Sequence, residues 1–404
     1  GPAGPGGAAD LGGQAGASSS AGGSAAGGGA GSGGGGTTSR SGGSAAAPGA
    51  AATAGGDTTG VTDKTITIGL HAPVTGAAAV PQTSFQRAVK VYFDSVNAKG
   101  GINGRKVEIL FRDDHFDPNT ARTECKELAE QEKVFMLIGG AGADQIDACA
   151  RYAAATGVPY VSGGVHETRP SLGSLGSLPT YFAASLTYAQ QVPLLARLMG
   201  NEFRGKEWGL VVADNDSLNS FYDRALAAGK GVSGEPALAR RIPKKTEADA
   251  PAVATAICTS GADVVVWNAS PSSFLNVTKS MGCTVTFIGP GLTNGLNIVT
   301  SAGCPNIAGS MFYSPMPGMD VMRRNNEFVT AYRRSAGAEP DDIGAAMYGL
   351  TKTVGLMLHA TGRNLTRESF MATIARVRSF NSGVFPATNY SSRFGGTAMH
   401  LLQA

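Results

Sequence analysis

Apolar residues follow two different spacings along the chain, and the two spacings alternate. Consecutive or alternating apolar residues predict buried strands at 65–74, 107–113, 134–140 and 158–164. Between them, apolar residues recurring at three and four predict helices at 84–96, 118–133 and 144–156. Successive strand and helix units of this kind are typical of a doubly wound α/β sheet whose strands are mainly parallel.

A second series with the same rhythm follows the first. It predicts strands at 208–214, 262–268 and 284–290, and helices at 217–230, 250–259 and 272–281. A crossing strand at 311–317 and helices at 324–334 and 343–361 come next. Two similar α/β series in tandem predict two Rossmann-like lobes.

The first sixty residues break this rhythm, because they are almost all Gly, Ala, Ser and Thr. Such a segment has almost nothing large enough to bury, so we expect 1–60 to be a disordered tether. The remaining stretch of the 404-residue chain is long for one core and suits two lobes.

Charge and hydropathy limit the partners. The net charge is +3, with acids and bases mixed along the chain, which argues against a nucleic-acid partner. No apolar run approaches the roughly 18 residues that span a bilayer. The chain opens with GPAGPGG, so we expect a trimmed N-terminus, with a removed signal peptide and a lipidated anchor cysteine before the tether.

The five cysteines show no CxxC motif and no cluster with histidine at metal spacing, so no zinc site is expected. Cys125 and Cys149 lie on the two predicted helices that flank one strand. This placement favours a disulfide between them in an oxidising compartment, although two buried thiols would also fit. Among Cys258, Cys283 and Cys304 a pair could form, and the spacing does not say which.

Several motifs at predicted strand ends invite a chemical interpretation. The stretch IGGAGADQ lacks the third glycine of a dinucleotide fingerprint, because Gln145 takes that place. Asp113, Asp114, His115 and Asp117 in DDHFDP could suggest a metal, but Asp117 and Pro118 fit a helix cap and first turn better. His166 and Glu167 are adjacent beyond a strand end, where side chains diverge. We therefore predict no catalytic, metal or cofactor site.

The predicted strand ends have a shared composition that favours ligand binding. They read HAPVTG, IGGAGADQ, VSGGVHET, VADNDS, VWNASPSS and IGPGLTN, and are rich in small polar residues. Ligands of open α/β sheets bind outside the carboxyl ends of the strands. A polar-lipped pocket between facing lobes is therefore predicted.

The order IGLHAPVTG, NAKGGINGRKVEILFRDDHFDP, IGGAGADQ, VPYVSGG and FIGP resembles the extracytoplasmic solute-binding proteins of branched-chain amino acid ABC transporters. The resemblance runs from about residue 62 to the C-terminus and implies a type I periplasmic-binding fold with three crossovers and hinge closure. It implies an N-terminal lobe of 61–184 plus 313–386 and a C-terminal lobe of 185–312 plus 387–404.

The resemblance also locates the ligand-binding positions, and several differ here from the amino acid binders. Ala143 and His166 stand where those proteins hold the ligand carboxylate, and Gly291 stands where an acid pairs with the ammonium. Pro81 and Leu218 replace shielding aromatic residues, whereas Tyr348 is kept. A buried ammonium without an acid costs several kcal/mol, so we expect a neutral or acidic, partly apolar or aromatic ligand.

The candidate ligand-binding residues share a position at a predicted strand end or on the late helix. They are Thr75, Gly142, Ala143, Gly164, His166, Asn215, Asn268, Asn294 and Tyr348. A carboxylate could be held by backbone amides after Gly142 and by His166.

The function expected first is that of a monomeric, extracytoplasmic, lipid-anchored solute-binding protein that binds a small molecule and partners an ABC permease. A sensor of the same fold, an enzyme built on this fold, and an amino acid binder with a rearranged site are the alternatives.

Overall fold

Two sheets organise the part of the chain that the computed structural model describes, which comprises residues 55–76, 83–88, 90–163, 168–169, 172–244, 248–290 and 306–404. The first sheet is parallel throughout and contains β1 (Thr65–Ala72), β2 (Lys106–Asp113), β3 (Met136–Gly139), β4 (Tyr160–Ser162) and β7 (Tyr181–Ala183). Its strand order is β2-β1-β3-β4-β7. The three strands from β3 onward are fully buried, as expected for a parallel sheet covered on both faces.

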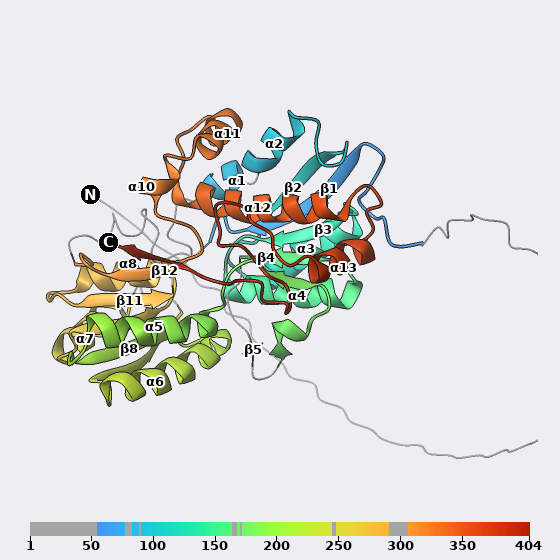
Figure 1. Cartoon of the computed structure of the whole chain (residues 1–404). Coiled ribbons are helices and arrows are strands. Elements are labelled where there is room, and N and C mark those ends of the chain that lie inside the picture. The colour runs from blue at the N-terminus through green and yellow to red at the C-terminus, as the bar shows by residue number, and fades with distance from the viewer. Residues whose placement is uncertain are drawn as a thin grey trace, which may run out of the picture. The chain divides into compact units, whose positions relative to one another are not determined.

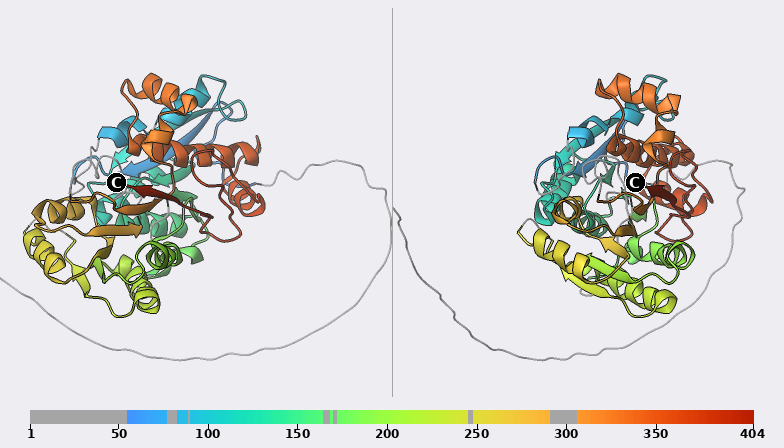
Figure 2. Two further views of the ribbon diagram at one scale, coloured as in Figure 1. Left: turned by 60° about the vertical axis from the view of Figure 1, so that its left-hand side comes forward. Right: turned by 90° about the vertical axis from the view of Figure 1, so that its left-hand side faces the viewer.

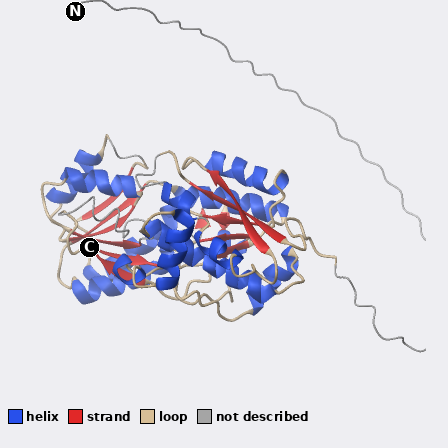
Figure 3. Cartoon of the chain, turned by 90° about the horizontal axis from the view of Figure 1, so that it is seen from above, coloured by secondary structure: helices blue, strands red, loops and turns tan. Residues whose placement is uncertain are grey.

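The second sheet has the order β13-β12-β11-β10-β8-β9. Its strands are β8 (Trp208–Ala213), β9 (Leu238–Ile242), β10 (Val264–Asn268), β11 (Thr286–Pro290), β12 (Met311–Ser314) and β13 (His400–Gln403). Only β13 runs antiparallel to its neighbour, β12. Figure 3 shows the strands of the two sheets as two separate groups with helices around them. The predicted two-lobed α/β fold is confirmed.

Helices cover both faces of the first sheet. One face carries α1 (Thr83–Ala88), α2 (Val91–Asn97), α12 (Asp342–Thr361) and α13 (Arg367–Arg376), and α11 (Asn326–Ala336) packs against α2. The other face carries α3 (Pro118–Glu130) and α4 (Ala143–Thr156), which pack against each other (Figure 1). Asp117 caps α3 by accepting bonds from the amides of Asn119 and Thr120, so the predicted cap is confirmed.

The second sheet has its own helices. They are α5 (Tyr188–Glu202), α6 (Asn219–Ser233), α7 (Ala250–Thr259) and α8 (Pro271–Ser280), and α10 (Met319–Met322) follows β12. Figure 2 shows these elements from two further directions. Short elements complete the fold: η1 (Leu175–Ser177), η2 (Asp216–Leu218), and the hairpin of β5 (Thr168–Arg169) and β6 (Gly173–Ser174).

The chain passes between the two sheets three times. It leaves the first sheet after β7, returns after β12, and lies again beside β7, where Ala183 pairs with Phe394, before it ends in β13. This matches the three crossovers that the resemblance implies. The detailed lobe boundaries stay a prediction.

Several elements differ from the sequence-based expectations. The helix expected at 84–96 is divided into α1 and α2, and α5, α13, β7, β9 and β13 were not predicted. The strand β9 is a half-polar edge strand with mostly partly buried residues, so it lacks the apolar pattern that marks a central strand. Among the described helices, none is both long and apolar enough to cross a membrane.

Two disulfides join neighbouring helices and loops. Cys125 of α3 is bonded to Cys149 of α4, which confirms the pairing favoured from the sequence. Cys258 at the end of α7 is bonded to Cys283, which settles two of the three remaining cysteines. Cys304 lies outside the described residues. Because the two closed loops are similar in length, with sequence separations of 24 and 25, the chain-entropy model gives them similar stabilising effects.

Candidate functional site

A cavity of about 260 Å³ lies between the carboxyl ends of the two sheets' strands. The residues that line it from the first lobe are Pro73, Phe85, Phe116, Pro118, Ala141, Gly142, Ala143, Asp144, Gln145 and Ile343. Those of the second lobe are Tyr188, Ala213, Asn215, Leu218, Lys244, Asn268, Ala269, Ser270 and Pro271. The ends of β1, β2, β3, β8, β9 and β10 therefore meet here, as expected for an open α/β fold.

The structure brings together four of the candidate ligand-binding residues. Gly142, Ala143, Asn215 and Asn268 all line the cavity. Thr75 does not line it, because its exposed hydroxyl donates a hydrogen bond to the Asp113 carboxylate, 2.7 Å away. The ligand-binding roles of all these residues stay predictions.

Tyr348 is also absent from the cavity lining. Its side chain is 1% exposed and packs against the rings of Tyr92 and Phe328. This position is explained by the core that α12 forms with α2 and α11, rather than by a ligand.

The remaining candidates cannot be placed. Gly164, His166 and Asn294 lie outside the described residues, as do Pro81, Glu167 and Gly291.

Hydrogen bonds join the loops after β1 and β2, which contribute Pro73 and Phe116 to the cavity lining. The Asp113 carboxylate accepts bonds from the amides of Val74 and His115, at 2.8 and 3.0 Å, and from the Thr75 hydroxyl, which also contacts the His115 ring. Burial raises the pKa of Asp113, but these hydrogen bonds outweigh it and hold the pKa below its usual range. DDHFDP is thus a structured loop whose carboxylates have protein partners.

This pKa shift predicts a pH effect. A carboxyl group whose pKa is lower in the folded state stabilises the protein above its unfolded pKa of about 3.9, and that stabilisation is lost as the pH falls through the folded value. We therefore expect Asp113→Asn to flatten the pH dependence of the free energy of unfolding below about pH 4. Urea unfolding at several pH values measures it, with the exposed Asp223→Asn as a control that should leave the slope unchanged.

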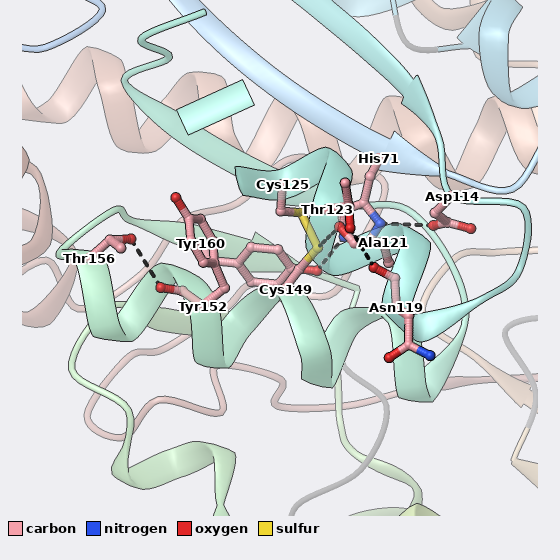
Figure 4. Close-up of a disulfide and its surroundings, with 10 residues drawn as sticks. All are labelled: His71, Asp114, Asn119, Ala121, Thr123, Cys125, Cys149, Tyr152, Thr156 and Tyr160. Carbon is pink, nitrogen blue, oxygen red and sulfur yellow. Dashed lines mark hydrogen bonds and ion pairs between the residues drawn. A yellow bond between two sulfur atoms is a disulfide. The ribbon is translucent and has the colours of Figure 1, made fainter. Parts of the chain in front are cut away.

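A fully buried polar network lies under the same loop. The Nδ1 atom of His71 is 2.8 Å from Asp114 Oδ2, and its Nε2 atom is 2.8 Å from the Tyr160 hydroxyl (Figure 4). All three side chains have no exposed surface. Gly139 lets the tyrosine approach, because a Cβ at this position would lie 1.9 Å from the Tyr160 hydroxyl.

The network positions an aromatic residue of the cavity. The other oxygen of Asp114 accepts a bond of 3.0 Å from the Phe116 amide. His115 and Phe116 both have positive φ, 52° and 55°, a conformation uncommon for residues other than glycine. Because such backbone persists only where its surroundings enforce it, we attribute the placement of Phe116 to Asp114 and to the clasp around Asp113.

The disulfide between α3 and α4 lies beside His71, as Figure 4 shows. The ligand atoms of His71, Cys125 and Cys149 lie within 4.8 Å of one another. The two sulfurs are bonded to each other, however, and offer no thiolates to a metal. This grouping therefore stabilises the fold and does not form a metal site in the oxidised protein.

Asn268 and Tyr188 bring polar groups to the described cavity lining. The Asn268 side chain is 3% exposed, and its Nδ2 atom is buried without a hydrogen-bond partner. Tyr188 lines the cavity at the start of α5, and burial raises its pKa to about 12, so its hydroxyl stays protonated. A buried donor without an acceptor is unfavourable, which makes Asn268 a point where a ligand acceptor would be stabilised.

The charged residues that line the cavity contact each other. Asp144 Oδ2 and Lys244 Nζ are 2.8 Å apart, although they come from different lobes. The remaining described lining is apolar or neutral, with the rings of Phe85 and Phe116 on one side and Leu218 on the other. The cavity therefore suits an apolar body with a few neutral polar contacts.

Sequence reasoning missed several of these residues. Phe85 reads as an ordinary apolar helix position, and Phe116 lies in the DDHFDP loop, where no pattern marks it as a ligand contact. Lys244 follows β9 and Tyr188 begins α5, two elements that were not predicted. The capping box of Thr187 and Gln190 before α5 was the one local signal that could have located Tyr188.

A larger cavity of about 650 Å³ lies elsewhere, between β13 and residues 316–323. Its lining includes Asp320, Arg323 and His400. It lies at the β13 edge of the second sheet, just beyond the carboxyl end of β12, and its Asp342 adjoins Ile343 of the smaller cavity. We take the smaller cavity as the candidate site, because the ends of strands from both sheets line it.

Comparison with known proteins agrees with this geometry. The model of the family described as periplasmic binding protein matches residues 65–403. An amino acid binding protein of Pseudomonas aeruginosa is 23% identical over 303 residues, which are 74% of this chain and 79% of that protein. Leu/Ile/Val-binding protein homolog 1 of Brucella abortus is 23% identical over 308 residues, 75% of this chain and 80% of that one.

Solved structures show the same fold. The branched-chain amino acid transporter substrate binding protein of Streptococcus pneumoniae, in complex with isoleucine, has a TM-score of 0.68 at 19% identity and covers 84% of this chain and 96% of its own. A solute binding protein of R. palustris in complex with 4-hydroxybenzoate has a TM-score of 0.68 at 18% identity, with coverages of 84% and 93%. The fatty acid substrate-binding protein of Thermomonospora curvata reaches 0.69 at 19% identity, with coverages of 85% and 90%.

Proposed function

Because the chain belongs to the periplasmic binding protein family, we propose that the cavity between its two lobes captures a small organic solute with an apolar, ring-sized body. The chain is a substrate-binding protein of the ABC transporter type. Proteins of this type bind small molecules outside the cytoplasm and work with a membrane permease. What we propose beyond the family's general function is the chemical class of the solute.

The buried amide of Asn268 carries this proposal. Asn268 lines the cavity and its Nδ2 atom has no hydrogen-bond acceptor in the protein, so an acceptor on the ligand would satisfy it. The surrounding Phe85, Phe116, Leu218 and Tyr188 favour an apolar body. A volume of about 260 Å³ is close to the lower end of ligand pockets, roughly 300 Å³, and suits a molecule of benzoate size.

The charges in the cavity disfavour a free α-amino acid. Of the described lining residues, Asp144 is the acid that could pair with a ligand ammonium, but three protein donors already contact its carboxylate. An ammonium buried without its own acid would cost several kcal/mol. The solved relatives that hold 4-hydroxybenzoate and 3,4-dihydroxybenzoic acid make an aromatic ligand compatible with this fold.

Other parts of the expected function belong to the same proposal. We expect a monomer that is lipid-anchored outside the cytoplasm, binds no nucleic acid and catalyses no reaction. A sensor of the same fold would bind the same ligand, and the presence or absence of a permease gene beside its own gene distinguishes sensing from transport.

A thermal-shift screen of the full chain tests the solute class. The panel contains hydroxybenzoates, their neutral aldehydes and amides, short fatty acids, sugars, nucleosides and the standard amino acids. A ligand at a hundred times its Kd should add about 2.7 kcal/mol to the free energy of unfolding. We expect the strongest shifts from aromatic compounds that are not amino acids. Strong stabilisation by leucine, isoleucine, valine or phenylalanine alone would overturn the proposal.

The same screen on Asn268→Ala tests the anchoring residue. Loss of the amide should weaken binding of the hit by about 1–3 kcal/mol, roughly 5- to 150-fold in Kd. The matched control is Asn276→Ala on α8, which makes the same substitution outside the cavity and should leave Kd unchanged.

A further inference from the structure

Three donors of the opposite lobe contact the carboxylate of Asp144. Its Oδ2 atom lies 2.8 Å from Lys244 Nζ and accepts a 3.1 Å bond from Asn215 Nδ2. Its Oδ1 atom accepts a 3.0 Å bond from the Ser217 hydroxyl. One side chain of the first lobe thus contacts residues that follow both β8 and β9 of the second.

Two of the three donors, Asn215 and Ser217, are arranged toward this carboxylate by their own local structure. Asn215 caps η2, and its Oδ1 atom accepts a 3.1 Å bond from the Ser217 amide. The single hydroxyl hydrogen of Ser217 is shared between Asn215 Oδ1, 2.9 Å away, and Asp144 Oδ1. These bonds leave the Nδ2 group of Asn215 directed to Asp144. Asn215 and Ser217 are therefore held in place to donate to a carboxylate.

Burial distinguishes this contact from an ordinary surface ion pair. The Asp144 residue is 8% exposed, whereas the Lys244 side chain is 54% exposed. Solvent weakens the lysine's contribution, but the bonds from Asn215 and Ser217 lie in the part-buried or buried region and are screened less.

Asp144 lies in the first turn of its helix. The helix α4 begins at Ala143 after Gly142, which has φ of 82° and provides no side-chain cap. A helix start favours negative charge, and the sequence indicated that a ligand carboxylate could be held here. The structure instead places the protein's own carboxylate in the first turn of this helix, facing the donors of the other lobe.

We propose that Asp144 takes the place of a ligand carboxylate, so that the second lobe closes on the first through a charge that the protein itself supplies. The same residue determines specificity: it excludes a carboxylate from this end of the cavity, because two carboxylates on one set of donors repel each other. Only this second consequence rests on the proposed function, and it places any ligand charge away from α4.

Chemical rescue tests the proposal without the natural ligand. Asp144→Ala removes the carboxylate and keeps the donors, so acetate should bind in its place. We expect acetate to raise the Tm of Asp144→Ala in the full chain, with an affinity about tenfold or more above that of the unchanged protein. Sodium chloride at equal ionic strength controls for screening.

Two further variants make the result specific. Asp214→Ala removes a neighbouring acid that does not line the cavity and whose side chain is 75% exposed. This variant should gain no response to acetate. Adding Lys244→Met to Asp144→Ala should weaken the rescue, because it removes the cationic partner of the bound acetate. If Asp144→Ala does not fold, the near-isosteric Asp144→Asn carries a second readout, faster amide hydrogen exchange at 213–218.

The outcomes separate the two proposals. Acetate rescue of Asp144→Ala that depends on Lys244 supports the inference, even if the ligand screen finds only amino acids. Absence of rescue, or equal rescue of Asp214→Ala, overturns it, even if the screen finds aromatic ligands. In Asp144→Asn, unchanged exchange at 213–218 also overturns it.

Discussion

Replacing Asp114 with alanine is expected to lower the free energy of unfolding by about 3–5 kcal/mol, although this residue does not line the cavity. The carboxylate is fully buried and is 2.8 Å from His71 Nδ1, so its loss leaves the ring in the core without this partner. It also removes the acceptor of the Phe116 amide. Urea unfolding followed by circular dichroism measures the loss.

Two variants separate the network from simple packing. Tyr160→Phe removes only the bond to His71 Nε2 and should cost about 1 kcal/mol. Asp114→Asn keeps the shape and an acceptor oxygen and should fall between the two. If Asp114→Ala lowered the free energy of unfolding by less than Tyr160→Phe does, the buried network would not stabilise the loop that carries Phe116.

The second large effect concerns the disulfides. Replacing both Cys125 and Cys149 with alanine should cost about 3 kcal/mol, and the pair Cys258 and Cys283 should cost a similar amount, because the closed loops have nearly equal length. Their accessibility differs, however. Cys125 and Cys149 have no exposed surface, whereas Cys258 and Cys283 are partly buried.

Reduction of the native protein should therefore occur in a fixed order. A mild reductant should open Cys258–Cys283 first, and Cys125–Cys149 should resist until the first lobe unfolds. Alkylation followed by peptide mass spectrometry measures the order. Simultaneous opening of both bridges, or earlier opening of Cys125–Cys149, would contradict the burial that this account assigns to the α3–α4 interface.

Much of the fold could be predicted because the information is local. A parallel strand covered on both faces reads as a continuous apolar run, and its helix reads as spaced apolar residues, so β3 and α4 are visible without a structure. The strand ends could also be expected to meet at one cavity, since parallel strands direct them to one edge. Gly142, Ala143, Asn215 and Asn268 follow from that rule alone.

The rest depends on contacts between residues far apart in the sequence. His71 meets Asp114 and Tyr160 only after three strands have paired, and no local pattern announces that a strand-end histidine will be buried. Asp144 looked like an ordinary acid in the first turn of a helix, because its partners Lys244 and Asn215 come from the other lobe.

Photo-crosslinking locates the bound solute directly, and so tests whether the solute binds between the two lobes. A diazirine derivative of the strongest hit from the thermal-shift screen would be irradiated with the full chain, and the labelled peptides sequenced. We expect labels on both lobes, near Phe116 and Ala143 on one and near Leu218 and Asn268 on the other. Labels confined to 316–323 and 400–404, around the larger cavity, would contradict it.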